Sequence, residues 1–234
     1  MDDEFVIDED LVDFYEASVD PLEVFDQKRY LEEELIGEGA FKQVYRVKDV
    51  TCNRDVALAR IKTGCEGKRA ILDFIREVQL AASLEHPNIA RIYDFGHDGS
   101  VPYFTMELIH GVTLDQWVQT EDKDFSGFRK LDLFLELCSA VTFAHSKNVL
   151  HLDLKPQNIH LSEHGRVLLA DWGISSYLAS SSLDDELLGS RNLKGFKAGT
   201  PGFSSPERLV GKEPNVASDI YSCLLYTSPS PRDA

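Results

Sequence analysis

The side chains best suited to chemistry lie in one short stretch, His151–Asn158, and in a second stretch that begins thirteen residues after it. The first contains a carboxylate, Asp153, a cation, Lys155, and a carboxamide, Asn158, and the second begins with the carboxylate of Asp171. A carboxylate can accept the proton of a hydroxyl group. A carboxamide and a second carboxylate supply the oxygen ligands that a hard cation prefers. This combination suits the transfer of a phosphoryl group from a nucleotide to a hydroxyl.

The residues around these side chains indicate how they are positioned. Pro156 disfavours helical backbone at the residue before it, so the first stretch is expected to be a rigid loop. Asp171 follows the apolar run 167–170 and precedes Trp172 and Gly173. Two motifs of this kind at this spacing resemble the catalytic and metal-binding loops of a eukaryotic-type (Hanks-type) serine/threonine protein kinase.

The resemblance implies a role for each of these side chains. Asp153 would accept or orient the hydroxyl proton, and Lys155 would neutralise charge on the transferring phosphoryl group. Asn158 and Asp171 would hold Mg²⁺ between the phosphates of ATP. The expected fold is α+β and two-lobed, with an antiparallel sheet and one helix in the first lobe and mostly helices in the second.

A glycine-rich segment lies between two expected strands, the first of which starts near Tyr30. Gly37 and Gly39 would let backbone N–H groups approach phosphates without a side chain in the way. The segment resembles the kinase loop that covers ATP, and the resemblance implies that Val44 faces the adenine. Lys42 stands where the family has its third glycine.

The next expected strand, 55–61, departs from the family pattern, because Ala59 stands where the family has a lysine. Side chains alternate between the faces of a strand, so Ala57 and Ala59 share the nucleotide side, and Arg60 and Lys62 point away. On the preceding strand Lys42 faces the same side as Val44. Lys42 is therefore the cation predicted to reach the phosphates, an arrangement similar to that of the with-no-lysine kinases.

A helix is predicted over 68–84 because apolar residues recur there at helical spacing. Within it, Glu77 matches the family's glutamate that orients the phosphate-binding cation. Met106 matches the gatekeeper position, and Glu107 to Ile109 match the hinge whose backbone holds adenine. Thr113 is a candidate ribose contact.

The stretch 175–197 is rich in serine and charge, which is typical of an activation loop but also of any mobile loop. Its candidate phosphorylation sites are Ser180, Ser181, Ser182 and Ser190. The segment Gly199–Glu207 is similar to the closing motif of Ser/Thr kinases and, with Lys155, favours Ser/Thr over Tyr as acceptor. Leu152 replaces the arginine that in the family pairs with a phosphate on the activation loop.

Length, charge and cysteines limit the remaining possibilities. The chain has 234 residues and a net charge of −16, so a nucleic-acid binder with a basic surface is not expected. Its four cysteines form no CxxC pair, which favours reduced thiols and a cytoplasmic location. No stretch has the pattern of a secretory signal or a membrane span. His160 and His164 are four residues apart, but they fall on an expected strand and turn, so they are not predicted to bind a metal.

Three regions are expected along the chain. Residues 1–29 carry eleven acidic residues and several aromatic ones, which predicts a flexible leader or, alternatively, a segment that docks on the kinase lobe or on a partner. Residues 30–222 form the kinase domain, with an N-lobe at 30–109 and a partial C-lobe at 110–222. The string 223–234 matches a translated sequencing adapter, so we expect it to be a non-native tail that leaves the C-lobe incomplete and this chain inactive.

The resemblance implies that the parent protein uses ATP and Mg²⁺ to phosphorylate Ser/Thr hydroxyls of a protein substrate. The alternative is a pseudokinase that binds nucleotide as a scaffold or regulator, which Ala59 favours. The presence of Asp153, Asn158 and Asp171 argues against it. A small-molecule phosphotransferase is disfavoured by the closing motif.

Overall fold

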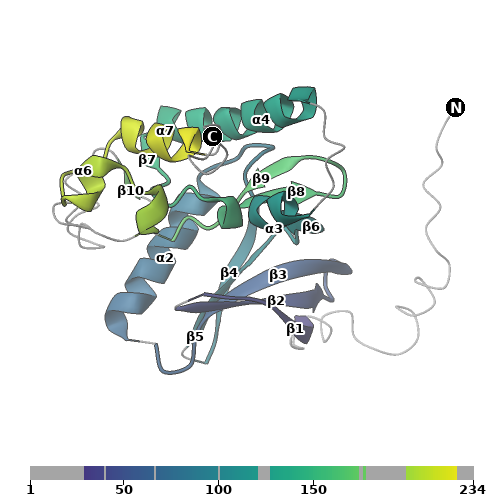
Figure 1. Cartoon of the computed structure of the whole chain (residues 1–234). Helices are drawn as coiled ribbons and strands as arrows, with labels where there is room; N and C mark the ends of the chain where they lie inside the picture. The colour runs from purple at the N-terminus through teal and green to yellow at the C-terminus, as the bar shows by residue number, and fades with distance from the viewer. Residues whose placement is uncertain are drawn as a thin grey trace, which may run out of the picture.

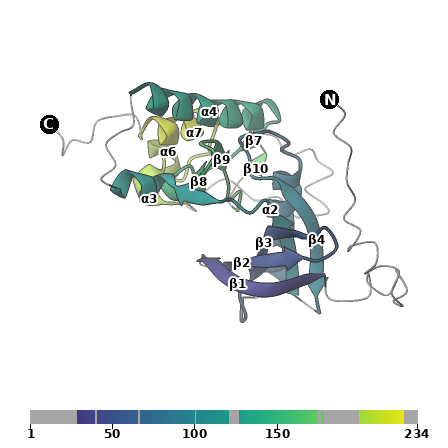
Figure 2. The same cartoon turned by 90° about the vertical axis from the view of Figure 1, so that its right-hand side faces the viewer.

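The computed structural model describes residues 29–39, 41–65, 67–99, 101–120, 127–173, 176–177 and 199–225. These residues form two lobes, a β-sheet with one long helix and a second lobe of helices and short strands (Figure 1). The view in Figure 2 shows the sheet below the helices α3, α4, α6 and α7. The α+β, two-lobed kinase-like fold predicted from the sequence is therefore confirmed, with a C-lobe that is incomplete.

The N-lobe is built on an antiparallel sheet whose strands lie in the order β1-β2-β3-β5-β4. Its strands are β1 (Tyr30–Glu38), β2 (Lys42–Asp49), β3 (Arg54–Ile61), β4 (Ile92–Asp98) and β5 (Val101–Met106). The helix α2 (Lys68–Ala82) packs with this sheet because Phe74 and Val78, one turn apart, both face it. They bury Ala59, Ile61 and Phe104.

The C-lobe begins after the hinge with β6 (Gly111–Thr113). This strand pairs with β8 (Ile159–Ser162), which directly follows the catalytic loop, so the hinge lies beside that loop. A side chain on Gly111 would collide with the carbonyl of Leu161. The remaining elements are α3 (Leu114–Gln119), α4 (Gly127–Ser146), β7 (Val149–Leu150), the 3₁₀ helix η2 (Pro156–Asn158), β8 (Ile159–Ser162), β9 (Val167–Leu169), β10 (Ser176–Tyr177), the 3₁₀ helix η3 (Pro201–Phe203), α6 (Pro206–Leu209) and α7 (Val216–Leu224).

The helix α4 is buried on one side only. Leu133, Leu137 and Ala140 lie in the main core, whereas Leu131 and Leu135 are 53% and 56% exposed. The sequence of 131–145 is apolar on most of the helix circumference, which predicts a buried helix; this prediction is wrong for the second face. Its apolar residues surround most of the helix, but β7 and β9 pack along one side.

The segment Asp219–Ser222 resembles the start of a helix of the kinase family, but α7 begins three residues earlier, at Val216. Asn215 caps it, since its side chain accepts a hydrogen bond from the N–H of Ala217. The helix continues two residues past Ser222, the expected domain boundary, and Cys223 is buried in the main core.

Several expectations concern residues that lie outside those described. They are the leader 1–28, the four candidate phosphoserines and the tail 226–234. No helix in the described part of the chain is long and apolar enough to cross a membrane.

Candidate active site

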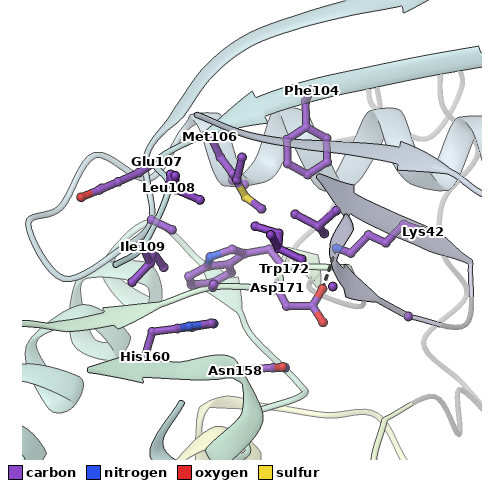
Figure 3. A pocket seen from close by; sticks show the side chains of 18 of the residues that line it. Lys42, Phe104, Met106, Glu107, Leu108, Ile109, Asn158, His160, Asp171 and Trp172 are labelled. Carbon is purple, nitrogen blue, oxygen red and sulfur yellow. Dashed lines mark hydrogen bonds and ion pairs between the residues drawn. The ribbon is translucent and has the colours of Figure 1, made fainter. Parts of the chain in front are cut away.

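A cavity of about 350 Å³ lies between the glycine-rich hairpin, the hinge and the catalytic loop (Figure 3). Most of the predicted nucleotide-binding and metal-binding residues line it: Gly37, Gly39, Lys42, Val44, Ala57, Glu77, Glu107, Ile109, Asn158 and Asp171. Thr113 does not. Its hydroxyl instead accepts a hydrogen bond from the N–H of Gln116 and caps α3, so a helix cap accounts for this residue.

Lys42 is held where the glycine-rich hairpin enters β2. The N–H of Gly39 donates to the carbonyl of Lys42 at 2.8 Å, which closes the turn between β1 and β2. The Lys42 ammonium forms ion pairs with Glu77 of α2 and with Asp171, where Nζ lies 2.7 Å from Oδ1 (Figure 3). A single cation thus joins the hairpin, α2 and the metal-binding loop.

The electrostatics of this cluster keep its members charged. Burial lowers the pKa of Lys42, but the carboxylates of Glu77 and Asp171 outweigh it and raise that pKa above its usual value. Burial likewise raises the pKa of Asp171, and the charge and hydrogen bond of Lys42 hold it below the ordinary range. Ammonium and carboxylate therefore stabilise each other's charged forms.

The other two cations near the missing lysine lie elsewhere. Lys62 pairs with Glu38, with Nζ 2.6 Å from Oε1. Arg60 pairs with Glu33 and stacks on a tyrosine ring. Ala59 is fully buried in the core beneath α2. Of these three cations, Lys42 is the one that contacts Glu77 and Asp171.

The carboxylate of Asp153 lies between two groups that orient it. Its Oδ2 accepts a 2.7 Å hydrogen bond from Lys155 Nζ, and its Oδ1 accepts the backbone N–H of Thr200 at 3.0 Å. The Thr200 hydroxyl lies 3.1 Å from both Asp153 Oδ1 and Lys155 Nζ. The closing motif thus contacts the catalytic loop directly. Thr200 was part of that motif in the sequence, but the motif alone gave it no role.

The ring of His151 holds the backbone of Asp153 in place. The N–H of Asp153 donates to His151 Nδ1 at 3.2 Å, so Nδ1 carries no proton, and Nε2 donates to the carbonyl of Ala170 at 3.2 Å. The ring packs against Trp172 with centroids 4.6 Å apart. Burial is the main cause of its lowered pKa, which favours the neutral tautomer that these bonds need.

Asn158 and Asp171 present oxygen atoms on the same side of the cavity, with Asn158 below Asp171 in the view of Figure 3. The amide nitrogen of Asn158 donates to the carbonyl of Asp153 at 2.9 Å, which leaves the amide oxygen as the outward group. A carboxamide oxygen and a carboxylate fit Mg²⁺, which takes few protein ligands and completes its shell with water and phosphate. Among the described residues there is no group of three or more His, Cys, Asp or Glu side chains that could hold a metal without a nucleotide.

The catalytic loop rests on the buried carboxylate of Asp219 in α7. This carboxylate accepts the backbone N–H groups of His151 at 2.9 Å and Leu152 at 2.8 Å, and His145 Nε2 lies 2.8 Å from it. On the other side the buried guanidinium of Arg208 donates to the carbonyl of Leu152. No local pattern in the sequence indicates this contact, because an arginine at the end of a short helix is usually exposed.

The hinge and His160 complete the cavity. The N–H of Glu107 donates to the carbonyl of Arg91 at 2.8 Å, which ties the hinge to the chain just before β4. His160 on β8 lines the cavity, and burial lowers its pKa. His164 is exposed in the turn after β8.

Comparison with known proteins agrees with this geometry. Residues 30–228 match the protein kinase domain family. Over 85% of its length the chain is 34% identical to serine/threonine-protein kinase PknD of Chlamydia trachomatis and to serine/threonine-protein kinase PknB of Mycolicibacterium smegmatis. PknD of Protochlamydia amoebophila is 33% identical over 82% of the chain.

The chain spans 22% to 32% of the length of these relatives. The match nevertheless covers both lobes and every loop of the cavity, and the chain belongs to the protein kinase family.

Proposed function

We propose that the parent protein transfers the γ-phosphoryl group of ATP to serine or threonine hydroxyls of proteins. The observation that carries this proposal is the position of Asp153, whose carboxylate is held by Lys155 on one oxygen and by Thr200 on the other. A carboxylate fixed in this way can accept a hydroxyl proton in one orientation. The names of the relatives, all serine/threonine-protein kinases, support the same reaction.

Each side chain of the cavity has one task in this proposal. Adenine would lie between Val44 and the backbone of the hinge, and Gly37 and Gly39 would admit the phosphates. Asn158 and Asp171 would hold Mg²⁺. When bound, Mg²⁺ neutralises charge on the phosphate oxygens.

The cations of the chain stabilise the reacting phosphate. Lys42 contacts the nucleotide phosphates, while Glu77 keeps its ammonium in place. Lys155 lies 2.7 Å from Asp153, so it can neutralise charge on the phosphoryl group that moves toward the hydroxyl held by Asp153. Fixed charges of this kind act where charge develops in the transition state.

The alternative, a nucleotide-binding pseudokinase, was suggested by Ala59. The contacts of Lys42 with Glu77 and Asp171 weaken that argument, because they supply a cation at the place where a missing lysine would leave none. We further infer a cytoplasmic location and no nucleic-acid partner. The four cysteines, all of them free thiols, and the net charge of −16 support these two inferences.

The test is phosphotransfer from radiolabelled ATP to a general protein substrate. It uses the parent protein with its native continuation, because the sequence predicts that residues 223–234 are a non-native tail. Wild-type protein should label serine and threonine, and Asp153→Asn should lower labelling by on the order of 10²-fold or more. Nucleotide binding by both proteins, with no labelling by either, would support the pseudokinase instead.

A further inference from the structure

The backbone of Leu152 is held at both of its polar groups by charged side chains. Its N–H donates to Asp219 Oδ1 at 2.8 Å, and its carbonyl accepts from the guanidinium of Arg208. The residue has a φ of +67°, a conformation that costs free energy for a non-glycine residue. Two groups from separate helices therefore maintain a strained backbone immediately before Asp153.

Arg208 is unusually placed for an arginine. It is 3% exposed, and a buried cation is tolerated only where charges and hydrogen bonds compensate for its lost hydration. Burial lowers the pKa of Arg208, and the negative charges of Asp219 and Asp153 oppose that effect. The negative charges near Arg208 thus come from Asp153 of the catalytic loop and from Asp219, which holds that loop.

Arg208 also links the closing motif to the catalytic loop. It lies on α6, directly after the segment that places Thr200 against Asp153. The closing segment therefore contacts the catalytic loop at two points, Thr200 on the carboxylate of Asp153 and Arg208 on the residue before it.

From these contacts we propose that Arg208 is a positioning residue for Asp153. It fixes the strained backbone at Leu152 so that the carboxylate of Asp153 points at the acceptor hydroxyl. The cation that holds the backbone of the catalytic loop is then Arg208 of α6. A charged side chain at position 152 is not needed for this role. This proposal rests on the proposed phosphotransfer, and it adds a residue that acts through Leu152 and not on ATP.

The test compares Arg208→Lys, Arg208→Met and, as a matched control, Arg69→Met in the parent protein. Arg69 is an exposed arginine on α2 that pairs with Asp73. Since small misplacement of a catalytic group lowers turnover strongly, Arg208→Met should reduce kcat by roughly tenfold to a hundredfold. The KM for ATP should stay within about twofold. Arg208→Lys should recover part of kcat, and Arg69→Met should match wild type.

Hydrogen exchange gives a second readout that needs no activity. In Arg208→Met, amides in 150–155 should exchange at least about tenfold faster, while those of β4 and β5 are unchanged. If the wild type is inactive, the proposed phosphotransfer is wrong. The hydrogen-exchange rates of amides 150–155 would still test the contact between Arg208 and Leu152. If Arg208→Met does not fold, Arg208→Lys should show an intermediate kcat at unchanged KM for ATP. Unchanged kcat together with unchanged exchange, in whichever variants fold, would overturn the proposal.

Discussion

The ammonium of Lys42 lies 2.7 Å from the carboxylate of Asp171, although 129 residues separate them in the chain. The same ammonium pairs with Glu77. In the family to which this chain belongs, the phosphate-binding cation comes from the third strand, where this chain has Ala59. Here the cation that pairs with Glu77 and Asp171 comes from the glycine-rich hairpin, which couples the position of that hairpin to α2.

Lys42→Met should lower phosphotransfer by on the order of 10²–10³-fold, because it removes a preorganised charge from the reacting phosphates. Lys62→Met is the matched control, since Lys62 pairs with Glu38 but does not itself line the cavity, and it should change kcat/KM by less than about threefold. Steady-state kinetics on both variants measure the difference. Equal losses would show that Lys42 has no special role.

Turnover should depend only weakly on phosphorylation of the serines at 180–182 and 190. Leu152 is 1% exposed and has no charge to pair with a phosphate. Phosphatase-treated and phosphorylated protein should differ in kcat by less than about threefold. A Ser→Ala variant at all four positions is the control and should behave as the dephosphorylated form. A large rise in turnover on phosphorylation would contradict this expectation.

The free energy of unfolding should fall as the pH drops below about 6.5, with His151 contributing. Burial holds the folded-state pKa of His151 below its ordinary value of about 6.5. Between these two pKa values the unfolded chain binds the extra proton, so stability is present above pH 6.5 and is lost toward lower pH. One such group contributes up to about 1.4 kcal/mol per pH unit.

Denaturant titrations between pH 5 and pH 7.5 measure this dependence. His151→Gln should show a shallower slope than wild type, although a lower stability at pH 7.5. His164→Gln, at an exposed position, should keep the wild-type slope. Burial also lowers the pKa values of His86 and His160, so some dependence should remain in His151→Gln.

The 234-residue chain should self-associate in solution. Apolar side chains on α4 and α7 are strongly exposed, among them Leu131, Leu135, Ile220 and Leu224, and exposed apolar surface favours association. Light scattering should show larger particles for wild type than for a variant with Leu131→Glu and Leu135→Glu. Val118→Glu on α3, at a position that is also strongly exposed, is the control for added charge alone. A monodisperse monomer would contradict this expectation.

The parts of the site that follow from local pattern could be predicted from the sequence. The period-two alternation of β2 and β3 predicted that Lys42 faces the cavity and that Lys62 does not. The extended backbone of Lys155 was predictable because Pro156 disfavours helical backbone at the residue before it, although a 3₁₀ turn follows at Pro156–Asn158.

Contacts across the molecule could not be predicted. Arg208 is buried because Leu152 and Asp219 surround it, and no local pattern signals that. Leu131 looked like a core residue, yet its exposure depends on which elements pack against α4. Thr113 was a candidate ribose contact, but its hydroxyl accepts a hydrogen bond from the N–H of Gln116 and caps α3.

Ala59 is buried and carries no charge, so the effects of substitutions at positions 42 and 59 should depend on each other. Adding a lysine at 59 alone would bring a second ammonium to carboxylates that Lys42 already occupies, and losing Lys42 alone would leave those carboxylates without a cation. A lineage that moves between the two arrangements passes through one of these impaired intermediates. The two positions are therefore expected to change together, because Glu77 and Asp171 accommodate one ammonium between them.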